Sequence, residues 1–329
     1  MGIELGPQMR RRLIGVVGIL LVLIVAMAVG PRPRMADSIR FDPASIGADP
    51  VAWLADREAA HKGVVDGAQK EIVWADPAAR TRTPLSVVYI HGFSATKWET
   101  RPLPDQVAKA LGANLFFTRL AGHGAGGEAL AAATMADWVD DIAEAIAIGE
   151  RIGERVLLVG VSTGATLAVW AARDPELMRK VAGMALLSPN FEIRGASVGL
   201  LNMPWGSYVL PRLMGETRSF TPLNDLHGKW WTTSYPSRAV FPMAALLRAV
   251  AEYRVISLKT PALFVYSPSD AVVDPAAIRR ALNEWGGPKK EFVVEKSGDP
   301  MNHVIAGDIL SPQTTDEISR AIAQWAAAL

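Results

Sequence analysis

The 329-residue sequence contains no cysteine. This absence excludes disulfide bonds, thiolate metal sites, iron–sulfur clusters and a cysteine nucleophile. A chain of this length can still bury a core large enough to fold without cross-links, as one large domain or two smaller ones. Any chemistry of the protein must therefore depend on other side chains.

The sequence also lacks a strong excess of charge of either sign, with 34 basic and 33 acidic residues. No basic run is longer than Arg10 to Arg12. A protein that binds nucleic acid needs a clustered basic face to neutralise phosphates. We therefore expect no nucleic-acid partner, and the sequence leaves the oligomeric state open.

Polar residues are absent from Leu13 to Gly30, where the sequence reads LIGVVGILLVLIVAMAVG. As a helix this segment would span about 27 Å, enough for the hydrocarbon core of a bilayer. The alternative is a cleaved signal peptide, because Arg10 to Arg12 precede the segment and Ala26 to Ala28 resemble a cleavage site. The apolar run is longer than a usual signal-peptide core, so we expect a single-pass membrane anchor.

Orientation in the membrane depends on the flanking basic residues. The tighter cluster, Arg10 to Arg12, lies before the apolar segment, and Arg32, Arg34 and Arg40 follow it. This asymmetry favours a cytoplasmic amino terminus and an extracytoplasmic body. Cleavage of the segment would instead give a secreted protein.

The whole chain is expected to form three parts: a tail and anchor over residues 1–34, a linker and peripheral helix over residues 35–70, and one domain over residues 71–329. In that domain, β-branched runs alternate with helical patterns, which is typical of a mostly parallel, doubly wound α/β sheet. The predicted strands are Glu71 to Trp74, Ser86 to Ile90, Ala113 to Thr118, Arg155 to Gly160, Val181 to Leu187, Ala262 to Tyr266 and Glu291 to Val294.

Helices are predicted from apolar residues spaced three or four apart. The predicted ranges are Pro50 to His61, Ala136 to Gly149, Ala276 to Trp285 and Thr315 to Ala328. One interval breaks the alternation of strands and helices, from about residue 190 to residue 259. It is rich in tryptophan and proline and predicts an inserted cap.

A serine between glycines is the first candidate for chemistry. Gly160 to Gly164 read GVSTG, directly after a predicted strand and directly before the helical pattern TGATLAVWAAR. A sharp strand-to-helix turn with a serine at its tip is the geometry of an exposed nucleophile. Ser162 is therefore the candidate nucleophile.

A serine hydroxyl needs a base to accept its proton, and the base needs an acid to hold its tautomer. His303 is the histidine that lies beyond the last predicted strand, and Asp270 follows the strand ALFVY. Asp274 is the competing acid, but it precedes Pro275, where an aspartate more often caps a helix. The chain order Ser162, Asp270, His303 suits an α/β sheet.

The negative charge that develops on a substrate oxygen needs two backbone N–H donors. The residue after the nucleophile, Thr163, supplies one, and Phe93 in the His91-Gly92-Phe93 turn after the strand VVYI is the candidate for the other. We interpret His91 and His123 as structural residues near the site. The histidines have no spacing that indicates a metal site, and we expect no cofactor.

At these motifs the chain resembles the α/β-hydrolase superfamily, in the branch of bacterial carboxylesterases, monoacylglycerol lipases and related serine peptidases. The matching segments are VVYIHGFSATKWE, FFTRLAGHGAGG, VLLVGVSTGATLA, YSPSDAVVDP and NHV, which cover roughly residues 71–329. The resemblance implies nucleophile Ser162, acid Asp270, base His303, and oxyanion donors Phe93 and Thr163. It also implies that residues 190–259 form a lid. Thr163 departs from the branch, where Met, Leu or Gln is commoner.

We expect an ester hydrolase acting on a lipophilic small-molecule substrate through an acyl-enzyme. The same residues could instead serve a serine aminopeptidase or a thioesterase, but a peptidase needs carboxylates for the substrate ammonium. Between Glu192, at the start of the cap, and Glu252, the only carboxylates are Glu216 and Asp225. A non-catalytic, membrane-anchored binding protein is a third reading, weakened because all three chemical positions are filled.

Overall fold

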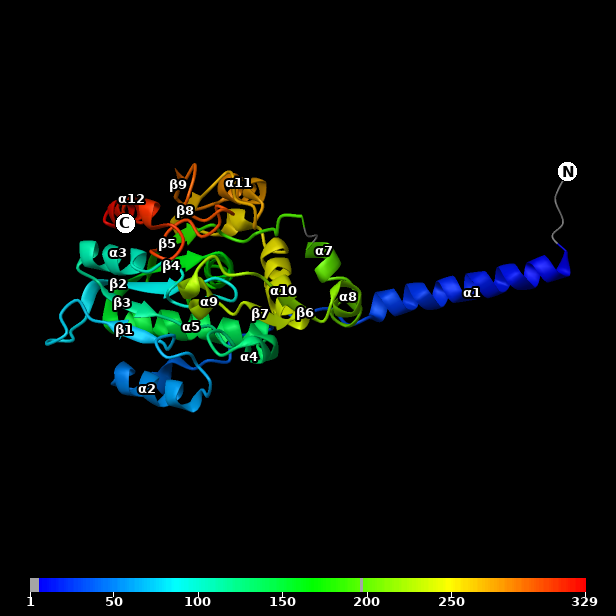
Figure 1. Cartoon of the computed structure of the whole chain (residues 1–329), viewed down its shortest axis with the longest axis horizontal. Helices are drawn as coiled ribbons and strands as arrows, with labels where there is room; N and C mark the ends of the chain where they lie inside the picture. The colour runs from blue at the N-terminus through cyan, green and yellow to red at the C-terminus, as the bar shows by residue number, and fades with distance from the viewer. Residues whose placement is uncertain (1–5, 196–197) are drawn as a thin grey trace.

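A seven-stranded sheet forms the centre of the computed structural model, which describes residues 6–195 and 198–329 (Figure 1). Its strands lie in the order β1-β3-β2-β4-β5-β8-β9, and every pair is parallel except β1 with β3. Their bounds are β1 Glu71–Val73, β2 Thr83–Ile90, β3 Asn114–Phe117, β4 Gly153–Val161, β5 Val181–Leu187, β8 Ala262–Tyr266 and β9 Lys289–Val293. The sheet confirms the predicted fold class and all seven predicted strands. Residues 1–5 of the expected tail and 196–197 of the expected cap lie outside the described residues.

Both faces of the sheet are covered, which explains the continuous apolar runs in its strands. In β2, Val88 and Ile90 face one core cluster, and Val87 and Tyr89 face the other. All four side chains are fully buried. Alternate residues of a strand point to opposite faces, so a strand covered on both sides needs an apolar residue at every position.

Helices form the two covering layers (Figure 1). One core cluster joins the sheet to α3 and α12, and the other joins it to α5, α6 and α11. The helix bounds are α1 Pro7–Val29, α2 Pro50–Ala60, α3 Leu103–Leu111, α4 Gly127–Ala132, α5 Met135–Ile152, α6 Thr163–Ala171, α7 Val198–Leu201, α8 Gly206–Met214, α9 Asp225–Trp230, α10 Val240–Ala251, α11 Pro275–Glu284 and α12 Pro312–Ala326. Three short 3-10 helices lie at Pro43–Ile46, Ser237–Ala239 and Val255–Ser257.

The described residues between β5 and β8 contribute no strand to the main sheet. Its described residues form α7 to α10 and a two-stranded antiparallel ribbon of β6 (Thr217–Ser219) and β7 (Ser234–Pro236). We call residues 190–259 the insertion. Its last helix, α10, is packed into the main core, where Leu246 and Leu247 are buried. Its middle part, around α8, is largely exposed.

Helix α1 projects away from the rest of the molecule (Figure 1). None of its residues is buried, and it is the one helix among the described residues that is long and apolar enough to cross a membrane. A membrane anchor and a signal sequence both have these properties. From Gly30, whose backbone is extended, the chain continues along the α/β unit, where Arg40 pairs with Asp137 and Asp140 of α5.

Candidate active site

Ser162 lies at the turn between β4 and α6. Its backbone has φ of 50° and ψ of −115°, an unusual conformation for a residue with a side chain. Its N–H donates to the carbonyl of Leu187 at 2.8 Å, which holds the turn against β5. The turn therefore lifts the hydroxyl above the carboxyl end of the sheet, where ligands bind in open α/β folds.

The two flanking glycines are required by close backbone contacts. A Cβ at Gly164 would lie 2.3 Å from the carbonyl oxygen of Ile90, and one at Gly160 would lie 2.7 Å from Cα of Ala165. Both distances are shorter than real Cβ contacts. The GVSTG pattern thus reflects the close approach of α6 to the carboxyl ends of β2 and of its own preceding strand, β4.

His303 joins the serine to an aspartate. Its Nε2 lies 3.0 Å from Oγ of Ser162, and its Nδ1 lies 2.8 Å from Oδ2 of Asp270. All three side chains are buried. Because a carboxylate accepts hydrogen bonds, Nδ1 carries the proton and Nε2 is free to accept from the serine hydroxyl.

Asp270 is itself held by backbone donors. Its Oδ1 accepts from the N–H groups of Val272 at 2.8 Å and Val273 at 2.9 Å, so Oδ2 is left for the histidine. Asp274, the competing acid, accepts from the N–H of Ala276 and caps α11. The structure therefore brings Asp270 to His303 and leaves Asp274 in the role of a helix cap.

The loop that carries His303 is fixed by a second buried carboxylate. Oδ2 of Asp299 accepts from the N–H groups of His303 at 3.0 Å and Val304 at 2.9 Å. The hydroxyl of Ser188 donates to the carbonyl of His303 at 2.7 Å. Hydrogen bonds to the backbone N–H and to the backbone carbonyl of His303 thus fix the position of its imidazole. The sequence pattern did not reveal Asp299 or Ser188.

The pKa of His303 is raised above its ordinary value. Burial alone would lower the pKa, but the hydrogen bond and charge of Asp270 outweigh burial, with further contributions from Glu99 and Asp299. An imidazole with a raised pKa is a stronger proton acceptor. This suits a group that takes a proton from a serine hydroxyl and holds it beside a carboxylate.

The two expected oxyanion donors follow the carboxyl ends of two neighbouring parallel strands, β4 and β2. Thr163 is the first residue of α6, and Phe93 follows the end of β2. Within the described residues, neither backbone N–H donates to another group. The Phe93 turn is fixed by Glu99, whose Oε2 accepts from the N–H of Gly92 at 2.6 Å.

Glu99 is a buried carboxyl group that the sequence pattern did not reveal. Burial raises its pKa to about 7, against the hydrogen bond from Gly92. Tyr89 lies beside it, with its hydroxyl 3.5 Å from Oε2 of Glu99. The carboxyl group of Glu99 therefore helps to fix the loop that carries Phe93.

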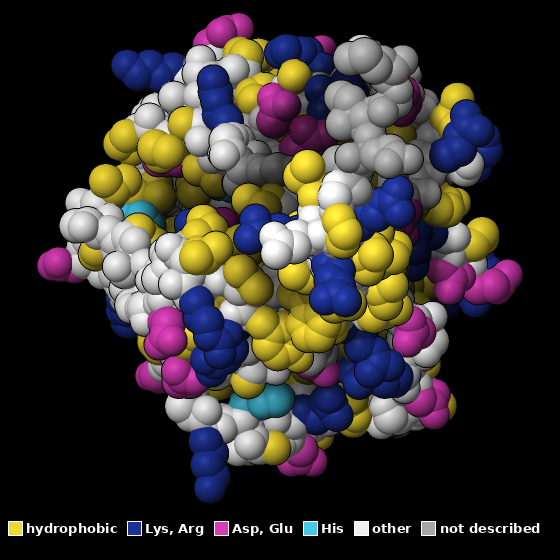
Figure 2. Space-filling model, turned by 90° about the vertical axis from the view of Figure 1, so that its right-hand side faces the viewer, with side chains coloured by type: hydrophobic (Ala, Val, Ile, Leu, Met, Phe, Trp, Pro, Cys, Tyr) yellow, Lys and Arg dark blue, Asp and Glu magenta, His cyan; other side chains and the backbone are white. Residues whose placement is uncertain are grey.

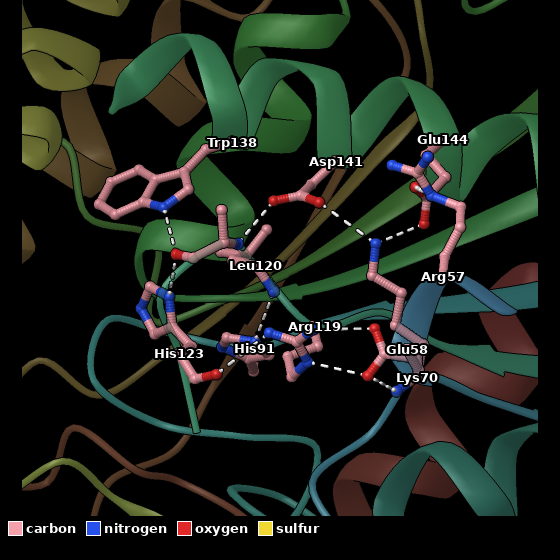
Figure 3. A network of polar contacts seen from close by, with 11 residues as sticks. Arg57, Glu58, Lys70, His91, Arg119, Leu120, His123, Trp138, Asp141 and Glu144 are labelled. Carbon is pink, nitrogen blue, oxygen red and sulfur yellow. Dashed lines mark hydrogen bonds and ion pairs between the residues drawn. The ribbon is translucent and has the colours of Figure 1, made fainter. Parts of the chain in front are cut away.

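His91 and His123 are fully buried and belong to a network below the same loop (Figure 3). Nε2 of His91 accepts from the N–H of Leu120 at 3.1 Å, and Nδ1 of His123 lies 3.1 Å from the carbonyl of Ala121. The indole of Trp138 donates to the same carbonyl at 3.0 Å. Burial lowers the pKa of His91 to about 4 and that of His123 well below its ordinary value, so both are neutral.

Buried charges complete this network (Figure 3). Lys70 contacts Asp141 and Glu144 of α5, and Arg119 forms two hydrogen bonds with Glu58. Burial lowers the pKa of Lys70, but the carboxylates around it outweigh this effect and raise it. These pairs connect the segment before β1 to the loop of His123, which lies beside the Phe93 ring. The sequence analysis did not predict them.

No group of three or more potential metal ligands lies together in residues 6–195 and 198–329. The side chains that meet at the site are a buried hydroxyl, an imidazole placed to accept its proton, and a carboxylate that holds the imidazole.

Known proteins resemble this chain in sequence. A thermostable monoacylglycerol lipase from Bacillus sp. (strain H-257) is 27% identical over 219 residues, which are 67% of this chain and 84% of the relative.

Solved structures resemble it in fold. One, from work on the metagenome-derived lipolytic enzymes LipS and LipT, has a TM-score of 0.65 and 22% identity, over 81% of this chain and all of the other. A soluble variant of monoglyceride lipase from Saccharomyces cerevisiae, in complex with a substrate analogue, has a TM-score of 0.57 and 15% identity, over 80% and 92% of the two chains.

The family comparison covers more than half of the sequence. Residues 87–308, which include Ser162, Asp270 and His303, match the family described as the alpha/beta hydrolase family. The chain belongs to the α/β hydrolase family.

Proposed function

We propose that the protein is a membrane-anchored serine hydrolase that cleaves lipophilic carboxylic esters, such as monoacylglycerol-like esters. The observation that carries the proposal is the continuous hydrogen-bonded chain from Ser162 through His303 to Asp270. It contains the nucleophile, base and acid that acyl transfer requires, in the order and geometry of a serine hydrolase.

In this mechanism Oγ of Ser162 attacks the ester carbonyl while Nε2 of His303 takes its proton. The C–O bond to the alcohol then breaks, and the imidazolium protonates the leaving alcohol. Water, deprotonated by the same imidazole, next attacks the acyl-enzyme and releases the acid with free Ser162. The backbone N–H groups of Phe93 and Thr163 stabilise the negative oxygen in both steps.

The substrate class is supported by the relatives and by the apolar character of the chain. The Bacillus relative is a monoacylglycerol lipase, and the yeast neighbour is a monoglyceride lipase. A lipophilic ester concentrates in a bilayer, which is where α1 would place the enzyme. We propose that the insertion acts as a cap over the acyl site, because it contacts the Phe93 loop: the N–H of Thr232 donates to the carbonyl of Ser94 at 2.7 Å.

Retention of α1 as an anchor is supported by a contact with the insertion. The indole N–H of Trp205 donates to the carbonyl of Ala26, inside the segment that resembles a cleavage site. Cleavage after Ala28 would remove this partner. We propose that the hydrolase domain lies on the extracytoplasmic side, as Arg10 to Arg12 favour. The mass of the protein purified from membranes tests retention, because a cleaved chain would be lighter by the first 28 residues.

The proposed activity is tested with Ser162→Ala. Hydrolysis of p-nitrophenyl esters and of a monoacylglycerol should fall by at least about a thousandfold, because the nucleophile is lost and binding is not. Ser207→Ala, which changes a serine of α8 distant in sequence from the turn, is the matched control and should retain activity. Unchanged hydrolysis in the Ser162 variant would contradict the proposal. Activity of the wild type on thioesters or aminoacyl peptides alone would instead identify a thioesterase or an aminopeptidase.

A further inference from the structure

Helix α8 presents a large apolar surface outward. Trp205, Tyr208, Val209, Leu213 and Met214 are all exposed, and the side chain of Leu213 is 76% exposed. We call these five residues the α8 surface. Tyr208, Val209 and Leu213 follow Trp205 by three, four and eight residues, which places these side chains on one side of the helix. Met214 is the last residue of α8. An unpartnered apolar surface of this kind usually marks a site of contact with a protein or a membrane.

The α8 surface is continuous with the end of α1. The indole N–H of Trp205 donates to the carbonyl of Ala26, in the last turn of α1, and its backbone N–H donates to the carbonyl of Pro31, both at 2.8 Å. The approach is close, because a Cβ at Gly30 would lie 2.3 Å from the Trp205 indole nitrogen. The guanidinium of Arg32 extends the contact by donating to the carbonyl of Asn202 at 3.0 Å.

This contact sets the depth of α8 relative to a bilayer. Arg10 to Arg12 of α1 are charged, so the part of the helix that suits hydrocarbon begins at Leu13. From Leu13 to Gly30 it spans about 27 Å, close to the ~30 Å hydrocarbon thickness of a bilayer. With α1 across the membrane, Ala26 lies near the boundary between hydrocarbon and headgroups. Trp205 is hydrogen-bonded to that residue, so it lies at the same depth, where tryptophan and tyrosine side chains are enriched.

The charges beside the α8 surface favour an anionic partner. Arg212 and Arg218 are exposed, and neither forms an ion pair with any residue the structure describes. Glu216 is the single acidic residue between positions 193 and 224. Figure 2 looks at the side from which α1 projects, and hydrophobic side chains, with Lys and Arg side chains beside them, occupy the middle of the view, where α1 points toward the viewer. Arginine beside an apolar surface is the pattern of an interfacial membrane contact.

We propose that the α8 surface lies in the headgroup region of the same bilayer that α1 crosses, so that the insertion is a second membrane contact. The inference rests on the proposed retention of α1. It identifies the insertion as the side of the hydrolase that meets lipid. The same insertion contacts the Phe93 loop through Thr232 and through the Tyr235 ring, whose centre is 5.4 Å from that of Phe93. A lipophilic ester dissolved in the bilayer therefore meets the enzyme on the side that carries the insertion.

The absence of cysteine allows a direct test with single nitroxide labels. Leu213→Cys is labelled in the full-length chain, reconstituted in nanodiscs that contain anionic lipid. Ile19→Cys in the middle of α1 is the lipid reference. Ala79→Cys is the water reference, because it lies in the exposed turn between β1 and β2, at the end of the molecule opposite to α1 (Figure 1). Collision with oxygen reports lipid, and collision with a nickel chelate reports water.

The expected result is a ratio of oxygen to nickel collision at Leu213 at least about threefold above that at Ala79, as for a side chain below the headgroups. Lipid contact at Ile19 with water contact at Leu213 would overturn the docking of α8 and leave the anchor in place. Water contact at both positions would overturn the anchor and the docking together. Protection of Leu213 from both reagents, with spin–spin broadening, would mean that a second copy covers α8 and would also overturn the proposal.

A kinetic test uses Leu213→Asp and the matched variant Val293→Asp, which changes an exposed valine on the edge strand β9. Each is assayed on a long-chain monoacylglycerol in vesicles and on a water-soluble short-chain ester. For Leu213→Asp the ratio of vesicle to soluble-ester activity should fall by about fivefold or more, because a carboxylate resists entry into the interface. Val293→Asp should keep the wild-type ratio. An unchanged ratio for Leu213→Asp would contradict the proposal, and the soluble-ester rate separates that outcome from loss of the fold or of the hydrolase activity.

Discussion

Helices α1 and α6 have similar compositions and opposite surroundings. After Arg12, α1 has no polar face, and α6 has none either, but no residue of α1 is buried, whereas every residue of α6 is. A helix without a polar face needs an apolar environment on all sides. Helix α6 finds it between the sheet, α5 and α10, and α1 has no protein around it that could supply it. The comparison teaches that α6 is a fixed part of the fold, and that α1 has the properties that a membrane anchor and a signal sequence share.

Catalysis should depend on the hydrogen-bonded groups that meet at the amino-terminal end of α6, and it should be independent of α1. Asp270→Asn should lower kcat by about 10,000-fold, because the histidine loses the group that holds its tautomer and stabilises its charge. Leu21→Ala in α1 should leave kcat unchanged. Steady-state kinetics on a soluble ester measure both, and a similar loss in the α1 variant would break the comparison.

The pH profile sharpens the same point. An imidazolium cannot accept the Ser162 proton, so wild-type activity should fall as the pH drops through the pKa of His303. Because this pKa is raised, the acid limb should lie above pH ~6.5, the ordinary value for histidine. Leu21→Ala should give the same profile. A rate that stays flat to well below pH ~6 would show that another group is the base.

Glycine provides a matched pair of substitutions in the two helices. A Cβ at Gly164 would lie 2.3 Å from the Ile90 carbonyl oxygen, but one at Gly18 would meet nothing within 4 Å. Gly164→Ala should displace the Ser162 turn and lower activity by about a hundredfold. Gly18→Ala should leave activity unchanged and favour the α1 helix slightly. Equal activity in the two variants would contradict the close approach of α6 to β2.

Core packing gives a smaller effect, measured as stability. Leu167 of α6 is fully buried, so Leu167→Ala should lower the free energy of unfolding by about 2–5 kcal/mol. Leu21→Ala in α1 removes the same atoms from a side chain that is 56% exposed and should not change the unfolding of the α/β domain. Denaturation in mild detergent, followed by tryptophan fluorescence, measures the difference between the two.

The smallest effect is expected at Thr163. Its hydroxyl is buried without a hydrogen-bond partner among the described residues, and only its backbone N–H has a proposed role. Thr163→Ala should therefore change kcat by less than about threefold and leave stability unchanged or slightly higher, since an unsatisfied polar group is removed. A large loss of kcat would assign the side chain a role that the geometry does not show.

Much of the fold could be predicted because it depends on local patterns. The seven strands were predicted within a few residues, since strands buried on both faces read as continuous apolar runs. Helix α3 was missed because it is short and follows Pro102, which hides its apolar spacing of Leu103 and Val107. The insertion was predicted as one cap, but the structure packs α10 into the main core and leaves α8 exposed.

The candidate site divides in the same way. Ser162, Asp270 and His303 could be named because each follows a strand that the sequence predicts, and the structure brings the three together. The roles of Glu99, Asp299 and the ion pairs of Lys70 could not be predicted, because the residue type alone does not show whether a charged group is buried or exposed. Their partners lie far away in the chain, as with Lys70 and Glu144.

The sequence by itself determined the order of the strands along the chain, the turn that carries Ser162 and the apolar character of α1, because these features depend on neighbouring residues. Only the tertiary structure decided which carboxylate reaches His303, which charged groups are buried, and that Trp205 of the insertion meets the last turn of α1. These outcomes depend on contacts between segments that are distant in sequence, and such contacts are formed only when the sheet and its layers are packed.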